Sequence, residues 1–276
     1  MRTSGERIRF PVAAGLFYPA NKEKILEAFV SYGMEKQIDN NSQVMAVIAP
    51  HCAWDLSGQV AADAFCACKE RRLSISRVVI LSSIHEPVDP GLFLSNSDFF
   101  ETPLGKIKVD SQANEELCSC STIFEINDIP HLSELSIEVL LPFVKYHFPK
   151  AAIVPVLMGS IFPGLVKGFA GALQLAFGGE CNNTIFIIST CLAKHTDNNK
   201  AACQADHFIK YCLEGNGNSI EQDYLNGIIS GCCAPLTAAF LESGLAEKKQ
   251  GCILPHGIQH FSRDGAHIYC GAIAFS

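Results

Sequence analysis

Two histidines stand just after apolar segments of the chain. His51 follows the apolar run at residues 44–48, and His85 follows a second run at residues 78–81. Both runs are typical of buried parallel strands. Open α/β sheets carry their chemistry at the carboxyl ends of their strands, so we expect the two imidazoles to share one site. Either histidine alone could simply cap a turn, whereas the pair favours a metal or catalytic centre.

The elements that must position these histidines alternate between strands and helices. This alternation predicts an α/β sandwich with a central, mainly parallel sheet flanked by helices. The chain has no linker, internal repeat or low-complexity segment, so we expect a single domain over residues 1–276. Strands are expected at residues 44–48, 78–81, 152–157, 184–189 and 266–275, and helices at 22–31, 59–69, 111–120, 136–143, 165–177, 220–230 and 235–245. Ser57 and Gly58 are expected to form a tight turn into the second helix.

Composition excludes several classes of function. The chain has 276 residues, of which 48% are hydrophobic and 18% charged, which is ample material for a large core. Its net charge of −7 argues against a nucleic-acid partner, because such a surface needs a basic patch. Residues 1–7 lack the apolar core of a signal peptide, and no apolar run approaches the roughly 20 residues that span a bilayer. We therefore expect a cytoplasmic protein without a membrane partner.

The thirteen cysteines are expected to be reduced thiols rather than a disulfide framework. The chain has no CxxC pair, which argues against zinc ribbons and the common iron–sulfur sites. It also has no GxGxxG, P-loop or GxSxG motif, so dinucleotide, nucleoside triphosphate and serine-hydrolase chemistry are not indicated.

Five segments, in this order along the chain, resemble the Memo family. They lie between Phe10 and Phe275 and read PVAAGLFYP (11–19), IAPHCAWDLSG (48–58), TPLG followed by VD (102–110), LSIE followed by LPF (135–143) and VPVLMG (154–159). The resemblance implies a fold related to the class III extradiol dioxygenases, which hold non-haem iron with two histidines and a carboxylate. It also implies the group called AmmeMemoRadiSam system protein B, whose members are encoded beside a radical-SAM protein and an AMMECR-type protein. Those two proteins are the partners that the resemblance implies.

Some of the family's polar positions are retained in this chain. His51 matches the first histidine of the family, and His85 matches the histidine of its "GPSH" segment. Glu86 stands where some members have a second histidine, and a carboxylate can still bind a hard metal. Glu138 matches the glutamate of "HSIE".

Other family positions have changed. Leu135 stands where "HSIE" has its histidine. In the "SSDxxH" segment, the aspartate is replaced by Cys191 and the histidine by Lys194, with His195 one residue later. The cysteine of the family's "CGxxP" segment aligns with a glycine, and Cys232 and Cys233 follow it directly. A shift of one residue in either loop would restore an imidazole or a thiol.

One hypothesis is an altered metal site in a metal-dependent redox enzyme. Thiolate ligands would favour a mononuclear Zn(II), Cu(I) or Fe(II) centre. In a metal-free variant, Cys232 or Cys191 would be a thiolate nucleophile with His51 as its base. The expected catalytic residues are His51, His85 and Cys232; the candidate ligands are His51, His85, Glu86, Cys191, His195, Cys232 and Cys233; and the candidate substrate-pocket residues are Trp54, Glu138, Lys194 and His256.

The alternative hypothesis is a binding or scaffold component of a radical-SAM-associated system. The changes at Leu135, Cys191 and Lys194 would then mark a site that holds no metal and no longer performs the family's chemistry. A small molecule or peptide would occupy the cleft instead. Residue types and spacing alone leave both hypotheses open.

Overall fold

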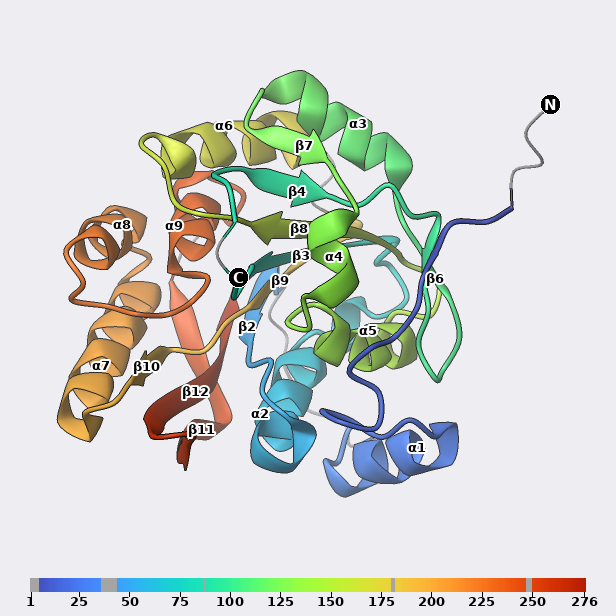
Figure 1. Cartoon of the computed structure of the whole chain (residues 1–276), viewed down its shortest axis with the longest axis horizontal. Coiled ribbons are helices and arrows are strands. Elements are labelled where there is room, and N and C mark those ends of the chain that lie inside the picture. Colours follow the sequence, from blue (N-terminus) through green and yellow to red (C-terminus); the bar gives the residue numbers. More distant parts are fainter. Residues whose placement is uncertain (1–4, 36–43, 87, 180–181, 247–249) are drawn as a thin grey trace.

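Four parallel strands form the centre of the main sheet of this protein (Figure 1). The computed structural model describes residues 5–35, 44–86, 88–179, 182–246 and 250–276. The four strands are, in order across the sheet, β2 (Ala46–Ala49), β9 (Thr184–Ser189), β3 (Arg77–Ser83) and β8 (Ala152–Met158). Their residues are mostly aliphatic and buried because helices cover both faces of the sheet. The carboxyl ends of these strands therefore meet at the same end of the sheet.

Antiparallel strands extend this parallel centre on both sides. Next to β2 lies β12 (Ala266–Phe275), which also pairs with β10 (Ala193–His195) and β11 (Gly251–Arg263). Next to β8 lies β4 (Leu92–Leu94), which pairs in parallel with β7 (Phe124–Ile126). A separate small sheet contains β1 (Ile8–Arg9), β5 (Phe99–Phe100) and β6 (Ile107–Lys108).

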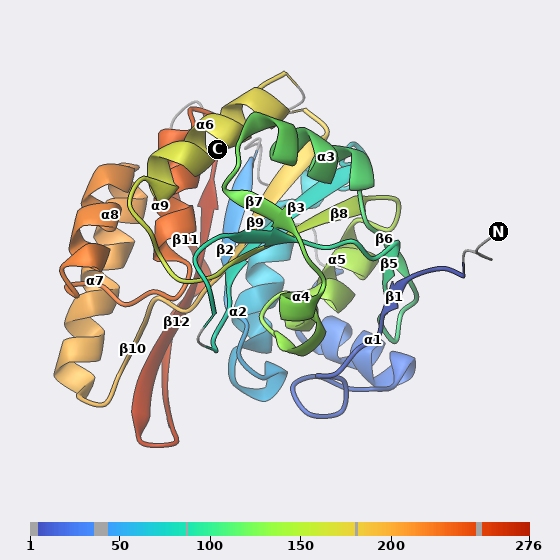
Figure 2. The ribbon, with the colours of Figure 1, turned by 45° about the horizontal axis from the view of Figure 1, so that its top comes forward.

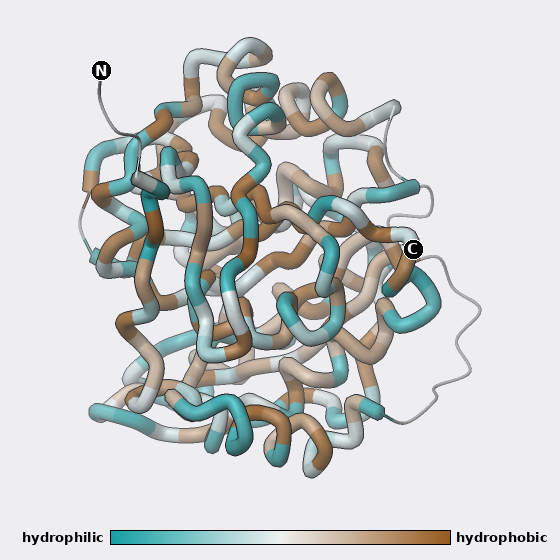
Figure 3. The backbone as a smooth tube through the Cα atoms, turned by 90° about the vertical axis from the view of Figure 1, so that its right-hand side faces the viewer, coloured by the Kyte–Doolittle hydropathy of each residue, from teal (hydrophilic) through white to brown (hydrophobic). Residues whose placement is uncertain are grey.

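Helices pack on both faces of the main sheet and enclose two apolar cores. Alternate residues of β2 divide between them: Val47 lies in one core, and Ile48 lies in the other. Figure 3 shows hydrophobic stretches alternating with hydrophilic ones along the chain. The face with Val47 carries α1 (Lys22–Ser31), α2 (Trp54–Ala67), η1 (Lys69–Arg71), η2 (Glu138–Leu140) and α5 (Leu141–His147). The face with Ile48 carries α3 (Ser111–Cys120), α6 (Leu165–Phe177), α7 (Asn198–Glu214), α8 (Gly217–Leu225) and α9 (Ala234–Glu242). The short helix α4 (Ile129–Ser133) lies between β7 and η2 in the chain.

The α/β architecture expected from the sequence is confirmed, with several helix bounds displaced. The helix expected at residues 220–230 is α8, which begins and ends earlier, and the helix expected at 136–143 is the 3-10 turn η2 followed by α5. Helix α2 begins at Trp54, five residues before the expected start, so Ser57 and Gly58 lie inside the helix rather than in a turn. Gly58 lies against the ring of Tyr32, where a Cβ atom would collide with the phenol. A close approach between two elements, rather than a turn, explains this glycine.

Two long elements lie outside those expected from the sequence. Helix α7 begins after Asp197, whose carboxylate accepts a hydrogen bond from Lys200 N, and ends at Gly215 in the left-handed conformation. Strand β11 turns into β12 through Asp264 and Gly265, both at positive φ, as a two-residue hairpin requires. This hairpin extends beyond the helices in Figure 2.

Among the described residues, no helix combines the length and the apolar character needed to cross a membrane.

Candidate functional site

Three donor side chains converge at the carboxyl ends of the parallel strands. His51 follows β2, His85 follows β3, and Cys232 lies in the loop just before α9. One ligand atom from each lies within 4.8 Å of the other two. The Cys232 Sγ atom is 3.7 Å from His51 Nε2, and the two imidazole centroids are 5.0 Å apart. The structure therefore brings together two nitrogen donors and one sulfur donor from distant parts of the chain.

A serine on the intervening strand fixes the orientation of His51. The Ser189 hydroxyl donates to the carbonyl of Ser136 at 2.7 Å, so its single proton is already used. Its oxygen lies 3.0 Å from His51 Nδ1 and must accept the proton of that nitrogen. The other ring nitrogen, Nε2, therefore faces Cys232. Burial lowers the pKa of His51, but the adjacent Cys232 sulfur outweighs it, and the net shift of the pKa is upward.

A buried carboxylate fixes His85 in a similar manner. Glu134 Oε1 lies 3.1 Å from His85 Nδ1, and Glu134 Oε2 accepts the backbone N–H of His85 at 2.8 Å. Although burial opposes it, the interaction with His85 lowers the pKa of Glu134 to about 2. Cys232 and Glu134 together raise the pKa of His85 to about 10. Carboxylate–imidazole pairs of this kind orient metal-binding histidines in proteins, with the second ring nitrogen directed at the ion.

The thiol of Cys191 stabilises Cys232 as a thiolate. The Cys191 backbone N–H and Sγ–H donate to Cys232 Sγ at 3.3 and 3.5 Å. The hydrogen bond from the Cys191 thiol, with the two imidazoles, holds the pKa of Cys232 well below its usual range despite burial. The same hydrogen bond raises the pKa of Cys191. Of these two sulfurs, Cys232 thus has the thiolate character, and Cys191 is its hydrogen-bond donor.

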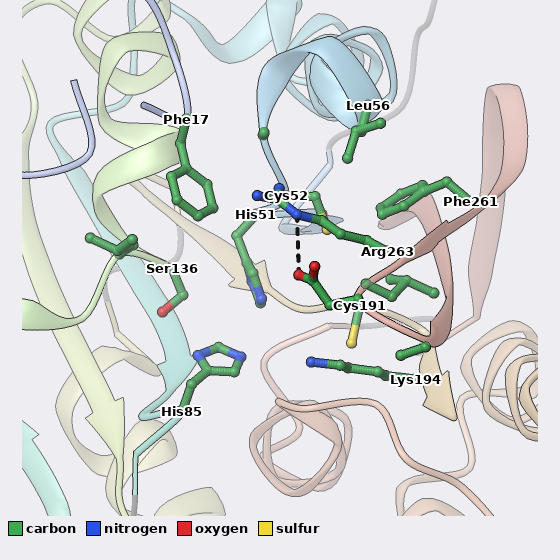
Figure 4. Close-up of a pocket in the computed structure, with 15 residues that line it drawn as sticks. Phe17, His51, Cys52, Leu56, His85, Ser136, Cys191, Lys194, Phe261 and Arg263 are labelled. Atoms are coloured by element: carbon green, nitrogen blue, oxygen red, sulfur yellow. Dashed lines mark ion pairs between the residues drawn. The ribbon is translucent and has the colours of Figure 1, made fainter. Parts of the chain in front are cut away.

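His51 and His85 line a cleft with a cavity of about 410 Å³, as does Cys191, the hydrogen-bond donor of Cys232. Figure 4 shows the rings of His51 and His85 directed into it, and the Lys194 ammonium extending toward them. Arg263 at the rim is already paired with Asp264 at 3.5 Å. Apolar side chains make up most of the remaining wall, namely Phe17, Leu56, Leu135, Phe261 and Ile268. The cleft is therefore an apolar pocket with a cationic group beside the donor cluster.

Three other candidate ligands lie next to the cluster in sequence, but their side chains are not part of the convergent group. His195 is in β10, and its Nδ1 accepts the backbone N–H of Asp197 at 2.8 Å. Cys233 is fully buried at the start of α9. Glu86 is exposed beyond His85.

Of the four candidate pocket residues, Lys194 lines the cleft as the structure describes it. The other three form contacts elsewhere. Glu138 is buried and forms an ion pair with Arg9. Trp54 packs against Phe143 with ring centroids 4.6 Å apart. His256 is in β11 rather than in a loop and pairs with Asp63 of α2 at 2.8 Å.

Several residues of the site were not among the candidates from sequence. Ser189 ends strand β9, between the strands that carry the two histidines, so the strand-end rule could have identified it. Glu134 has no distinguishing spacing in the sequence. Phe261 and Arg263 line the cleft because the hairpin β11–β12 places them there. The Asp264–Gly265 pair is a sequence pattern typical of a two-residue hairpin turn and could have predicted it.

Comparison with known proteins identifies the family. The family model for Memo-like proteins matches residues 9–218, which include His51 and His85 and end before Cys232. A MEMO1 family protein from Thermotoga neapolitana is 30% identical over 228 residues, covering 79% of this chain and 81% of the relative. One from Nitrosopumilus maritimus is 30% identical over 214 residues, covering 75% and 76%. One from Methanobrevibacter smithii is 28% identical over 232 residues, covering 80% of each. This chain therefore belongs to the Memo-like protein family.

Proposed function

We propose that this protein binds one transition-metal ion through His51, His85 and Cys232 and is a metal-dependent redox enzyme. The observation that carries the proposal is the direction of the donor atoms. Ser189 and Glu134 engage the Nδ1 atoms of the two histidines, which leaves their Nε2 atoms for a common ligand beside the thiolate.

The chemistry of this donor set fits particular metals. Two imidazoles and one thiolate are ligands of Zn(II), Fe(II) and copper ions, whereas Mg(II) and Ca(II) prefer oxygen. Three protein ligands are typical of catalytic sites, which keep one position for a substrate or water. A bound ion would supply Lewis-acid or redox chemistry at the base of the cleft.

The walls of the cleft favour a small anion with an apolar body. The charge of Arg263 is matched by Asp264, whereas the Lys194 ammonium extends into the cavity beside His85. Phe17 and Phe261 would pack against the apolar part of a ligand and exclude water. The volume of about 410 Å³ lies within the range of small-molecule sites.

Metal analysis tests the first part of the proposal. Protein purified without oxygen and without a polyhistidine tag should contain about one Fe, Cu or Zn ion per chain. His51→Ala and Cys232→Ala should lose that ion, and His195→Ala, a matched change outside the cluster, should keep it. A wild-type protein without stoichiometric metal, or equal retention in all three variants, would refute the proposal.

Ligand binding tests the second part. Phenylacetate should bind more tightly than phenylacetamide, its uncharged analogue, in an isothermal titration. Lys194→Met should weaken phenylacetate binding about tenfold or more, because a charged hydrogen bond contributes roughly 1.5–3 kcal/mol. Arg263→Gln should have a smaller effect because that guanidinium is already paired. Equal binding of the two probes to the wild-type protein would contradict an anion site.

Two cleft residues favour a second candidate function. Leu135 and Lys194 line the cavity, and the resemblance to the family places a histidine at each of those positions. The cleft would then be a binding surface of a radical-SAM-associated system, with radical-SAM and AMMECR-type proteins as partners. Under this alternative, metal-free protein should co-purify stoichiometrically with a co-expressed partner, and Leu135→Asp should disrupt the complex.

A further inference from the structure

A second pair of thiols lies beside the donor cluster. Cys52 directly follows His51 and lines the cleft, and Cys270 lies in β12, fully buried. Their Sγ atoms are 3.6 Å apart although 218 positions separate the two residues in the chain. The proposed metal site uses neither thiol.

We propose that Cys52 and Cys270 form a reversible disulfide when a peroxide enters the cleft. A disulfide bond is about 2.05 Å long, so the two sulfur atoms must approach by roughly 1.5 Å, which small side-chain rotations can supply. Strand β12, which carries Cys270, pairs directly with β2, and the segment after β2 carries Cys52. The two backbones are therefore already fixed beside each other.

The difference in exposure assigns a separate role to each thiol. Cys52 is half-buried and faces the cavity, so it meets the oxidant first. Its sulfur attacks one oxygen of hydrogen peroxide, the O–O bond breaks, and water leaves with formation of a sulfenic acid. Cys270 then attacks that sulfur, the S–O bond breaks, and a second water leaves. Two thiols and one peroxide thus yield one disulfide and two waters, and the peroxide takes up both electrons.

The neighbouring pair, Cys191 and Cys232, is expected to behave differently. Its sulfurs are 3.5 Å apart, but Cys232 is a proposed metal ligand, and Cys191 is its hydrogen-bond donor. The disulfide between Cys52 and Cys270 needs neither residue. A test of this disulfide can therefore succeed or fail independently of the proposed metal site.

Peptide mapping of the peroxide-treated full-length protein tests the proposal. Free thiols are blocked with N-ethylmaleimide, and the digest is analysed without reductant. We expect a linked peptide pair containing Cys52 and Cys270, lost after dithiothreitol. The same pair should persist in Cys232→Ala and in Cys203→Ala, a control for an exposed cysteine.

The variant Cys270→Ala supplies a second readout. Without its partner thiol, Cys52 should accumulate as sulfinic acid at peroxide concentrations that leave wild-type Cys52 in the disulfide. The proposal is overturned if wild-type Cys52 and Cys270 both remain alkylated after peroxide treatment, or if Cys52 links to a different cysteine. The wild-type result does not depend on the stability of any variant.

Discussion

Two clusters of polar residues in this protein differ in burial and in where their polar atoms point: the first is buried, whereas His85 of the second is exposed to the cleft. The Glu138 carboxylate is paired with the Arg9 guanidinium and also accepts the Ala13 N–H at 2.7 Å and the Tyr18 hydroxyl at 3.0 Å. Its lone pairs are therefore directed at donors from the N-terminal segment. The carboxylate fixes that segment, including neighbouring Phe17 of the cleft wall, and has little capacity left for a ligand.

The donors of the second cluster point toward one another. His51, His85 and Cys232 are each oriented by a partner on the far side, and their remaining donor atoms lie within 4.8 Å of one another. The comparison shows that burial and polarity alone do not identify a site. A buried group whose hydrogen bonds are complete stabilises the fold, whereas convergent donor atoms are what a ligand requires.

The largest expected effect is a loss of stability at the first cluster. Glu138→Gln removes the charge that neutralises Arg9, and breaking a buried ion pair costs about 3–5 kcal/mol. Urea unfolding should show this decrease in the free energy of unfolding. Glu86→Gln, at an exposed glutamate, should change it by less than about 0.5 kcal/mol. Equal stability of the two variants would contradict a structural role for Glu138.

A second effect on stability depends on pH and comes from two buried histidines. Burial lowers the pKa of His131 to about 4 and that of His147 to about 3. Both values lie below the unfolded-state value near 6.5, so the unfolded chain binds more protons below that pH. Stability should therefore fall as the pH decreases from about 6.5 toward 4, by on the order of 3 kcal/mol for each histidine.

The variant His147→Gln tests this pH dependence. It should remove about half of the loss between pH 7 and pH 4, measured as the shift in the urea midpoint. An exposed histidine, changed in His260→Gln, provides the control and should leave the loss intact. The same acid sensitivity in His147→Gln as in the wild type would contradict the assignment.

A smaller effect is expected at the second cluster. Glu134→Gln keeps the size of the side chain but removes the charge beside His85. Loss of such an orienting partner typically weakens metal binding 10- to 100-fold, which corresponds to about 1.4–2.8 kcal/mol. Competition with a zinc chelator should detect the change, with Glu86→Gln as the matched control. Wild-type affinity in Glu134→Gln would show that His85 does not need its carboxylate partner.

The sequence predicted the architecture well because long apolar strands and amphipathic helices are local patterns. The strand ends that carry His51 and His85 followed from the same patterns. Strand β11 was not predicted, because its bulged pairing with β12 between Ile253 and Ile258 interrupts the alternation.

The details of the site depend on tertiary contacts that a sequence does not encode locally. Choosing Cys232 over Cys233 requires the conformation of a loop, in which one thiol meets His51 and the other lies in the core. Likewise, Glu134 and Glu138 are one helical turn apart in sequence. Their different partners, His85 and Arg9, come from distant segments.

Cobalt binding tests the central claim most directly, because a thiolate ligand gives Co(II) an intense near-ultraviolet charge-transfer band. Metal-free wild-type protein titrated with Co(II) should develop this band with about one equivalent per chain. Cys191→Ala and Cys233→Ala should keep the band, and Cys232→Ala should lose it. A band that persists in Cys232→Ala, or Co(II) binding to the wild-type protein without a band, would contradict a metal centre built on His51, His85 and Cys232.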